Sequence, residues 1–206
     1  MVVIGLTGGI GTGKSTVSAM LADQGSVIIN ADLVGHEAYL PHQNVWDQVV
    51  AAFGRDILAG DDQVDRRKLG AIVFQDPAAL KRLNAIVHPW IFQRIAQLLG
   101  ELRAKGVRVA VVEAALLIEA GWRSLVDEVW VTTAGEEQVV QRLQARSGLT
   151  PEQVRNRMRT QLSTEERKQY ADVVVDTSGS LEDVRALVRG LWESKVAAAL
   201  KERPSD

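Results

Sequence analysis

The chain of 206 residues contains no cysteine. This excludes a disulfide framework, a thiolate nucleophile and a zinc site built from cysteines. An excess of charge is also missing, because 24 Lys and Arg stand against 26 Asp and Glu, which gives a formal net charge of −2. Such a balance gives no electrostatic support for a nucleic-acid or membrane partner.

Long hydrophobic runs are absent too. No apolar stretch approaches the ~20 residues that span a bilayer. The first residues lead directly into a glycine-rich loop, which leaves no room for a signal peptide. We therefore expect a cytoplasmic protein that binds neither nucleic acid nor a membrane. A chain of this length can bury one core with a small insertion.

Residues 8–15 fit the pattern Gly-x-x-x-x-Gly-Lys-Ser. The unbroken apolar run at 2–6 is typical of a buried strand, and Val17, Met20 and Leu21 recur afterwards at helical spacing. In a strand, glycine loop and helix of this kind, successive backbone N–H groups surround a polyphosphate. The alternative is a glycine-rich turn with a surface lysine, and the flanking strand and helix favour the nucleotide site.

Each residue type in this loop suits a task in phosphate binding. Gly11 and Gly13 leave room where a Cβ would collide or demand strain. Lys14 is expected to reach the β- and γ-phosphates of the nucleotide, and the Ser15 hydroxyl to ligate Mg²⁺. The residues that we assign to ATP from this segment are Gly9, Gly11, Thr12, Gly13, Lys14, Ser15 and Thr16.

Strand and helix signals then alternate, which predicts an α/β fold with a parallel sheet covered by helices. Further strands are expected at 27–29, 107–112, 129–131 and 173–175. The helical interval at about 33–104 is too long for a simple crossover. We expect it to form a lobe over the carboxyl edge of the sheet, where ligands bind in such folds.

Cap residues mark several of the expected helices. Asp65 and Asp76 can each cap a helix, and Ser180 can cap a terminal amphipathic helix. Residues 150–153 and 163–166 both fit a capping box. From Glu193 onward the sequence becomes polar, and we expect the terminal helix to fray there.

Asp32 directly follows the second expected strand, so its side chain should face the same sheet edge as the phosphate loop. A carboxylate there can accept the proton of an attacking hydroxyl or steer Mg²⁺. By its position, Asp32 could equally well be the N-cap of the next helix. It could serve both as this cap and as the catalytic carboxylate. His36 follows at i+4 on the same helix face.

Other candidate residues belong to the helical lobe or to the end of the third strand. Arg66, in the basic run 66–68, can bind a substrate phosphate or lie on a solvated helix surface. His88 can line the lobe, although His88-Pro89 also fits a helix junction. Glu113 can orient a metal-bound water or be a strand-terminal surface residue. Leu116 and Glu119 lie in an apolar loop that could line an acceptor site.

The interval between the fourth and fifth strands is rich in arginine. Arg142 and Arg146 share a helix face at i, i+4. Guanidinium groups suit phosphate oxygens, and a mobile arginine lid can neutralise a transferring phosphoryl group while it excludes water. We therefore interpret residues 136–168 as a lid, although each arginine taken alone fits a surface position. The arginines of this interval are Arg142, Arg146, Arg155, Arg157, Arg159 and Arg167.

Taken as an ordered set, these motifs resemble the dephospho-coenzyme A kinase family from end to end. The motifs that carry the resemblance are residues 6–16, Ala31-Asp32 with His36, Asp65-Arg66-x-x-Leu69, Val73-Phe74, Leu83-Asn84-x-x-Val87-His88-Pro89, Leu116-Leu117-Ile118-Glu119-x-Gly121, Arg142-Leu143-x-x-Arg146, Arg157-Met158-x-x-Gln161 and Ala171-Asp172.

The resemblance implies a P-loop kinase, a three-layer sandwich whose five-stranded parallel sheet has the order 2-3-1-4-5. It also implies transfer of the ATP γ-phosphoryl group to the ribose 3′-hydroxyl of dephospho-CoA, with Asp32 as the base and with Arg66 and His88 in the acceptor lobe. Two positions depart from the family pattern. Asn30 stands where a second acid is common, and Thr177 stands where an asparagine near the adenine is common.

Three other functions fit parts of the sequence. A kinase of the same build could act on a nucleoside monophosphate or a sugar. A GTP-binding switch is suggested by Asp32-Leu33-Val34-Gly35, but a guanine-reading Asn-Lys-x-Asp is missing. A nucleotide-binding regulatory subunit without turnover is the third. We expect a monomer or a weak homo-oligomer.

Overall fold

The computed structural model describes residues 1–41 and 43–202. The chain divides into two compact units, which are described separately below. The first comprises Met1–Asn30 with Leu99–Asp206, and the second comprises Ala31–Leu98.

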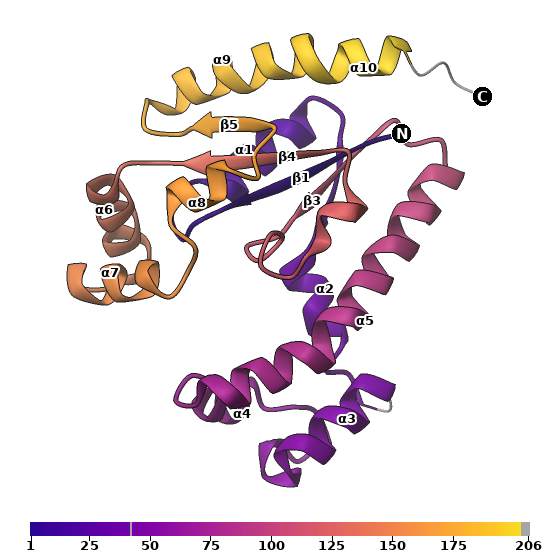
Figure 1. The fold of residues 1–206 in the computed structure, drawn as a ribbon, viewed down its shortest axis with the longest axis vertical. Helices are drawn as coiled ribbons and strands as arrows, with labels where there is room; N and C mark the ends of the chain where they lie inside the picture. Colours follow the sequence, from indigo (N-terminus) through magenta and orange to yellow (C-terminus); the bar gives the residue numbers. More distant parts are fainter. Residues whose placement is uncertain (42, 203–206) are drawn as a thin grey trace. The chain divides into compact units, whose positions relative to one another are not determined.

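A five-stranded parallel sheet forms the centre of the first unit (Figure 1). Its order is β2-β3-β1-β4-β5, which confirms the expected topology. The parallel pairing places the carboxyl ends of the strands at one edge, with Gly8 opposite Thr132 and Asn30 opposite Glu113. The strands are β1 (Val2–Gly8), β2 (Val27–Asn30), β3 (Val109–Glu113), β4 (Glu128–Thr133) and β5 (Val173–Asp176).

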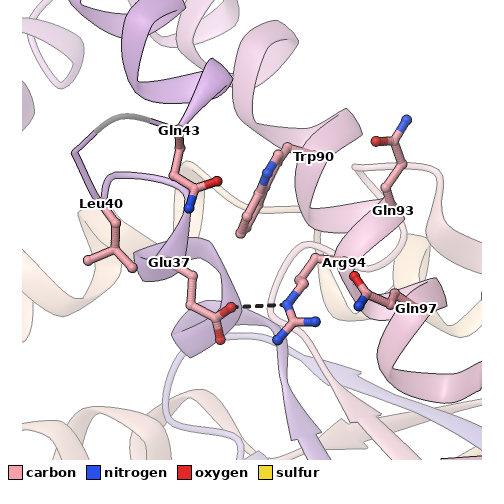
Figure 2. A pocket seen from close by; sticks show the side chains of 7 residues that line it. All are labelled: Glu37, Leu40, Gln43, Trp90, Gln93, Arg94 and Gln97. Carbon is pink, nitrogen blue, oxygen red and sulfur yellow. Dashed lines mark hydrogen bonds and ion pairs between the residues drawn. The ribbon is translucent and has the colours of Figure 1, made fainter. Parts of the chain in front are cut away.

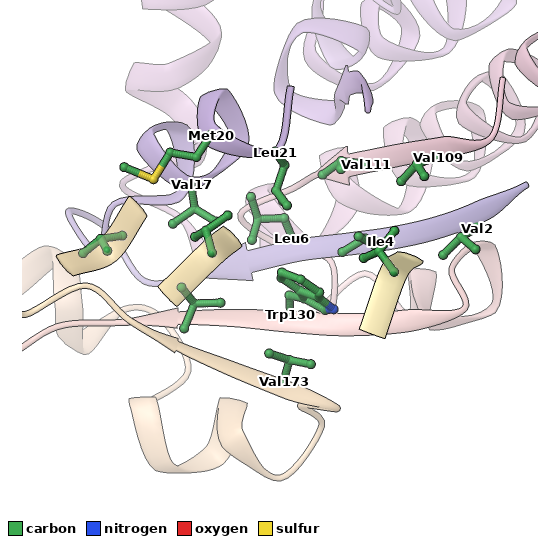
Figure 3. Packing of buried hydrophobic residues seen from close by; sticks show 14 residues of the cluster. Val2, Ile4, Leu6, Val17, Met20, Leu21, Val109, Val111, Trp130 and Val173 are labelled. Carbon is green, nitrogen blue, oxygen red and sulfur yellow. The ribbon is translucent and has the colours of Figure 1, made fainter. Parts of the chain in front are cut away.

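Every residue of β1 is buried, as expected for a central parallel strand with both faces covered. On one face, Ile4 and Leu6 pack in a cluster with Trp130 of β4 and with residues of α1 (Lys14–Asp23) and α9 (Leu181–Leu191), as Figure 3 shows for several members. This packing anchors α1, and with it the loop that precedes α1.

The opposite face of β1 is covered by the segment that follows β3. A Cβ at Gly5 would lie 2.7 Å from Leu117 and 3.0 Å from Val126, so the segment approaches the strand closely there. The short helix η2 (Trp122–Leu125) lies within this segment. Its packing fixes the loop that carries Leu116 and Glu119.

Between β4 and β5 the chain forms α6 (Glu136–Ser147), α7 (Pro151–Arg159) and α8 (Thr164–Lys168). Both expected capping boxes are present, with Thr150 capping α7 and Ser163 capping α8. A small apolar cluster of Val139, Val140, Leu143 and Val154 holds α6 and α7 together.

The expectation that the terminal helix frays after Glu193 is wrong for the residues that the structure describes. Ser180 caps α9 as expected, but the helix then passes through the π-helical turn Trp192–Val196 into α10 (Ala197–Glu202). Val196 is buried, and Leu200 packs against the same core. These apolar residues at i, i+4 give the helix a buried face that the polar composition concealed. Residues 203–206 lie outside the described part of the chain.

The second unit is helical, with α2 (Ala31–Glu37), α3 (Asn44–Phe53), α4 (Arg66–Val73) and most of α5 (Pro77–Ala104). The short helix η1 (Arg55–Ile57) follows α3, and one isolated antiparallel bridge joins Leu58 to Val64. Asp65 caps α4, as the sequence predicts.

The alternative interpretation of His88-Pro89 as a helix junction is wrong, because Pro89 lies inside α5. Proline removes one backbone hydrogen bond from a helix interior. Val87 and Ile91 on either side are both buried, and their packing keeps the helix intact. Each helix in the described ranges is too short or too polar to span a bilayer.

Candidate active site

Hydrogen bonds between residues of the glycine-rich loop at 8–15 fix its conformation. The Lys14 ammonium donates to the Gly8 carbonyl at 3.0 Å and to the Gly9 carbonyl at 3.4 Å. The Thr12 hydroxyl donates to the Gly9 carbonyl at 2.8 Å and lies 2.8 Å from the Thr132 hydroxyl of β4. These contacts place the lysine over the loop, where it can meet a phosphate.

Three glycines of the loop are required by its geometry. Gly13 has a φ of 82°, a left-handed conformation that L side chains rarely adopt, and it stands at the N-cap of α1. A Cβ at Gly8 would lie 2.7 Å from the Thr132 carbonyl oxygen and would also collide with the Thr132 hydroxyl. The Gly11 position is closed by protein as well, because a Cβ there would lie 2.9 Å from Val139.

The Ser15 hydroxyl donates to the Glu113 carboxylate at 3.0 Å. Ser15 lies in the first turn of α1 and Glu113 ends β3, and the parallel sheet brings the carboxyl ends of β1 and β3 to the same edge. Within the described residues no group of three or more His, Cys, Asp or Glu is placed to bind a metal. A hydroxyl and one carboxylate suit Mg²⁺, which is usually held by one or two carboxylates together with substrate phosphates.

Arg142 of α6 is fixed by Thr177, the residue that follows β5. The guanidinium donates to the Thr177 hydroxyl at 3.1 Å and to its carbonyl at 2.6 Å. The buried Thr177 hydroxyl also lies 3.1 Å from the carbonyl of Thr12 and 3.1 Å from that of Thr133. Thr177 thus connects the phosphate loop, the sheet edge and Arg142. Arg146, the other arginine predicted on α6, is exposed.

Glu119 is bound by an arginine that sequence reasoning did not assign to the site. The side chain of Arg167 is 1% exposed, and its guanidinium donates to the Glu119 carboxylate at 2.6 Å. It also donates to the Ala115 carbonyl at 3.2 Å and to the Thr7 hydroxyl at 3.4 Å. Arg167 therefore joins α8 to the end of β1 and to the loop that carries Leu116, which is 36% exposed.

Gln161, in the segment between β4 and β5, contacts the phosphate loop. Its side-chain oxygen accepts a hydrogen bond from the Ile10 backbone N–H at 2.9 Å. A cavity of about 430 Å³ adjoins this contact, and Gly9, Thr12 and Arg159 are among the residues that line it. The sequence placed Gln161 within a motif, but nothing in the motif indicated a contact with the loop.

In the helical unit, the structure brings Asp32, His36 and Arg66 close enough for their charges to interact. Partial loss of hydration lowers the pKa of His36, the Arg66 charge lowers it further, and the Asp32 carboxylate opposes both. Burial raises the pKa of Tyr39, and the Arg66 charge acts in the opposite direction. Asp32 lies in the first turn of α2, whose first residue is Ala31, so the N-cap interpretation of Asp32 is wrong.

His88 lies on α5 and is half-buried, and burial lowers its pKa. The helical unit also contains a pocket of about 400 Å³ beside α2 and α5. Figure 2 shows Glu37 and Arg94 joined across it by an ion pair of 3.1 Å, with Trp90 above them. None of the residues predicted for the acceptor lines this pocket in the described part of the chain.

The parallel sheet, the glycine loop that Lys14 closes and the Ser15–Glu113 pair at the strand ends define a P-loop kinase fold. Shikimate kinase from Bacteroides thetaiotaomicron has this fold, with a TM-score of 0.54 at 14% identity over 93% of this chain and 96% of that chain.

The chain belongs to the dephospho-CoA kinase family, because the model of that family matches residues 2–183. The dephospho-CoA kinase of Geobacter sulfurreducens is 45% identical over 195 residues, which are 95% of this chain and 99% of that protein. The dephospho-CoA kinase of Dehalococcoides mccartyi is 41% identical over 97% of this chain and all of its own length. The solved structure of dephospho-CoA kinase from Campylobacter jejuni is 25% identical, with a TM-score of 0.72 over 96% of this chain and 98% of that chain.

Proposed function

We propose that this protein transfers the γ-phosphoryl group of ATP to the ribose 3′-hydroxyl of dephospho-CoA, which yields CoA and ADP. The observation that carries the proposal is the phosphate loop of a dephospho-CoA kinase family member, with Lys14 folded over its carbonyls and Ser15 bonded to Glu113. It acts, in this proposal, in the cytoplasm as a monomer or a weak homo-oligomer.

In the transfer step, the 3′-oxygen forms a bond to the γ-phosphorus. The bond between that phosphorus and the bridging oxygen of the β-phosphate breaks, and its electron pair leaves with ADP. We assign Asp32 as the base that receives the hydroxyl proton. Its exposed carboxylate follows β2 by two residues, at the sheet edge where ligands bind in folds of this kind.

Little covalent help is needed, because phosphoryl transfer depends mostly on positioning and on stabilisation of charge. We assign Lys14 to the β- and γ-phosphates, together with the amides of Gly9, Gly11, Thr12, Gly13, Ser15 and Thr16. Arg142 is held by Thr177 toward the same loop, and the exposed Arg146 is free to approach as the segment 136–168 closes.

We assign Ser15 and Glu113 to Mg²⁺, because their two oxygens lie 3.0 Å apart beside the phosphate loop. A bound Mg²⁺ would neutralise phosphate charge during the transfer. Glu113 is buried, so its carboxylate is fixed in place before the ion binds.

For the acceptor we assign Asp32, His36, Arg66 and His88 of the helical unit, with Leu116 and Glu119 from the loop after β3. The Arg66 cation suits a phosphate of dephospho-CoA, and its charge already acts on His36. Glu119 is oriented for this task by its ion pair with Arg167.

The direct test is to mix the purified protein with Mg²⁺-ATP and dephospho-CoA and to detect CoA by mass. Shikimate, a sugar acid and a nucleoside monophosphate serve as parallel acceptors, since shikimate kinase shares the fold. GTP in place of ATP tests the donor. The proposal predicts CoA as the product, and preferential phosphorylation of another acceptor would refute it.

A further inference from the structure

The side-chain amide of Gln161 has a fixed orientation. The Ile10 backbone N–H can only donate, so the Gln161 atom that faces it at 2.9 Å must be the oxygen. The amide nitrogen, with its two N–H donors, therefore lies on the other branch of the side chain. A single hydrogen bond to the phosphate loop thus decides which way both donors point.

The surroundings of Gln161 place those donors beside the phosphate loop. The residue is half-buried and lines the 430 Å³ cavity together with Gly9, Ile10 and Thr12 of the loop. Its oxygen would lie 3.7 Å from a Cβ at Gly9. In the described part of the chain, the side chain of Gln161 shows no further hydrogen bond. The two N–H groups are therefore available to a ligand.

Two arginines of the segment 136–168 differ from Gln161 in this respect. Arg167 is committed to Glu119, and Arg155 pairs with Glu136 at 2.7 Å. A neutral donor that is already oriented loses little free energy to reorganisation when the ligand binds. Its hydrogen bond becomes stronger as negative charge develops on the oxygen that it faces. The equatorial oxygens of a transferring γ-phosphoryl group carry such charge.

We propose that Gln161 is a further catalytic residue, whose side-chain N–H groups donate to an oxygen of the γ-phosphoryl group during transfer while its oxygen remains on Ile10. This inference rests on the kinase activity proposed above. It differs from a purely structural role, in which Gln161 would only accept from Ile10 and keep the loop in shape.

The substitution Gln161→Glu separates the two roles, because a carboxylate still accepts from Ile10 but cannot donate. We expect kcat for CoA formation to fall about 10²-fold, the scale of losing one preorganised donor. The affinity for a non-hydrolysable ATP analogue should also fall, whereas the affinity for ADP, which lacks the γ-phosphoryl group, should stay within about twofold.

Two further variants complete the test. Gln161→Met removes the donors without adding charge and should lose at least as much kcat. Gln141→Glu adds the same charge on the exposed face of α6 and should keep normal kcat, which controls for electrostatics at a distance. A Gln161→Glu enzyme with near-normal kcat would overturn the proposal, whether or not Gln161→Met is impaired. The wild-type enzyme must form CoA in the same assay, so failure of this inference is distinct from failure of the proposed function.

Discussion

At the scale of single residues, the buried Arg167 contacts several groups around the site. Its guanidinium satisfies the Glu119 carboxylate and the Ala115 carbonyl inside the protein. Arg167→Met would leave both acceptors without this donor. We expect a loss of roughly 3 kcal/mol in the free energy of unfolding, the low end for a broken buried pair because Glu119 is partly exposed.

Denaturant unfolding of this variant measures that loss. The matched control is Arg155→Met, which breaks the ion pair with Glu136, where the two side chains are 44% and 56% exposed. Exposed pairs contribute at most about 1 kcal/mol. Equal losses for the two variants would show that the Arg167 contacts do not stabilise the fold.

Asp32 provides the second prediction at this scale. If its carboxylate receives the hydroxyl proton, Asp32→Asn should lower kcat by at least about 10²-fold, the lower range of a general-base contribution. Because the residue lies outside the phosphate loop, the dissociation constant of an ATP analogue should change little. The measurement is steady-state kinetics combined with direct nucleotide binding. Turnover at the wild-type rate would leave Asp32 without a chemical role.

The third prediction concerns His88 and the pH dependence of stability. Burial lowers its pKa in the folded protein below the ordinary value of 6.5. Between these two values the unfolded chain binds the proton more readily, so protonation favours unfolding. The stability that neutral His88 contributes is therefore complete above pH 6.5 and is lost as the pH falls through the folded pKa.

We expect the Tm of the wild-type protein to fall between pH 7.5 and pH 5.5, and His88→Gln to reduce that fall. His36→Gln should also reduce that fall, because the pKa of His36 is lowered in the folded protein as well. A larger fall in the His88→Gln variant would contradict the assigned direction.

The phosphate loop could be predicted from the sequence because its function depends on local spacing. The roles of Arg167 and Gln161 could not, because they depend on where α7 and α8 fold back on β1. Arginine is usually a surface residue, so its occurrence in an arginine-rich interval does not predict burial. The contacts of Thr177 could not be predicted from the sequence either, because its hydrogen bonds with Thr12 and Arg142 form only after the sheet has assembled.

At the scale of elements, the C-terminal helix gives a prediction about its own packing. Val196 is 2% exposed within the π-helical turn, whereas Lys195 beside it is exposed. We expect Val196→Ala to reduce the free energy of unfolding by about 1.5 to 2 kcal/mol through lost burial. Lys195→Ala should change it by less than about 0.5 kcal/mol. Equal effects in denaturant titrations would mean that the helix end contributes no packing.

The elements also show which signals can be read from a sequence. Strands with β-branched runs and helices with capping boxes were predicted because their causes are local, as Thr150 and Ser163 illustrate. The continuation of α5 through Pro89 was not predicted, because packing on both sides of the proline outweighs one missing backbone hydrogen bond. The π-helical turn at Trp192–Val196 was not predicted either, although Val188 before it and Val196 within it pack in the same core.

At the scale of the whole molecule, the two units suggest separate ligand responses that can be measured independently. The residues that we assign to ATP lie in the unit of Met1–Asn30 and Leu99–Asp206, whereas most of those assigned to the acceptor lie in Ala31–Leu98. A bound ligand protects the backbone amides whose opening it suppresses. A non-hydrolysable ATP analogue should therefore slow hydrogen exchange at residues 8–16 and around Thr177.

Dephospho-CoA should add protection within Ala31–Leu98, around Asp32, His36 and Arg66, that the ATP analogue alone does not give. Hydrogen exchange followed by mass spectrometry of peptic fragments measures both patterns on the intact chain. Arg66→Ala is the matched variant, because it should weaken the response to dephospho-CoA and leave the response to the ATP analogue unchanged. If dephospho-CoA protects only the sheet unit, the helical unit does not bind the acceptor, and the roles assigned to His36, Arg66 and His88 are wrong.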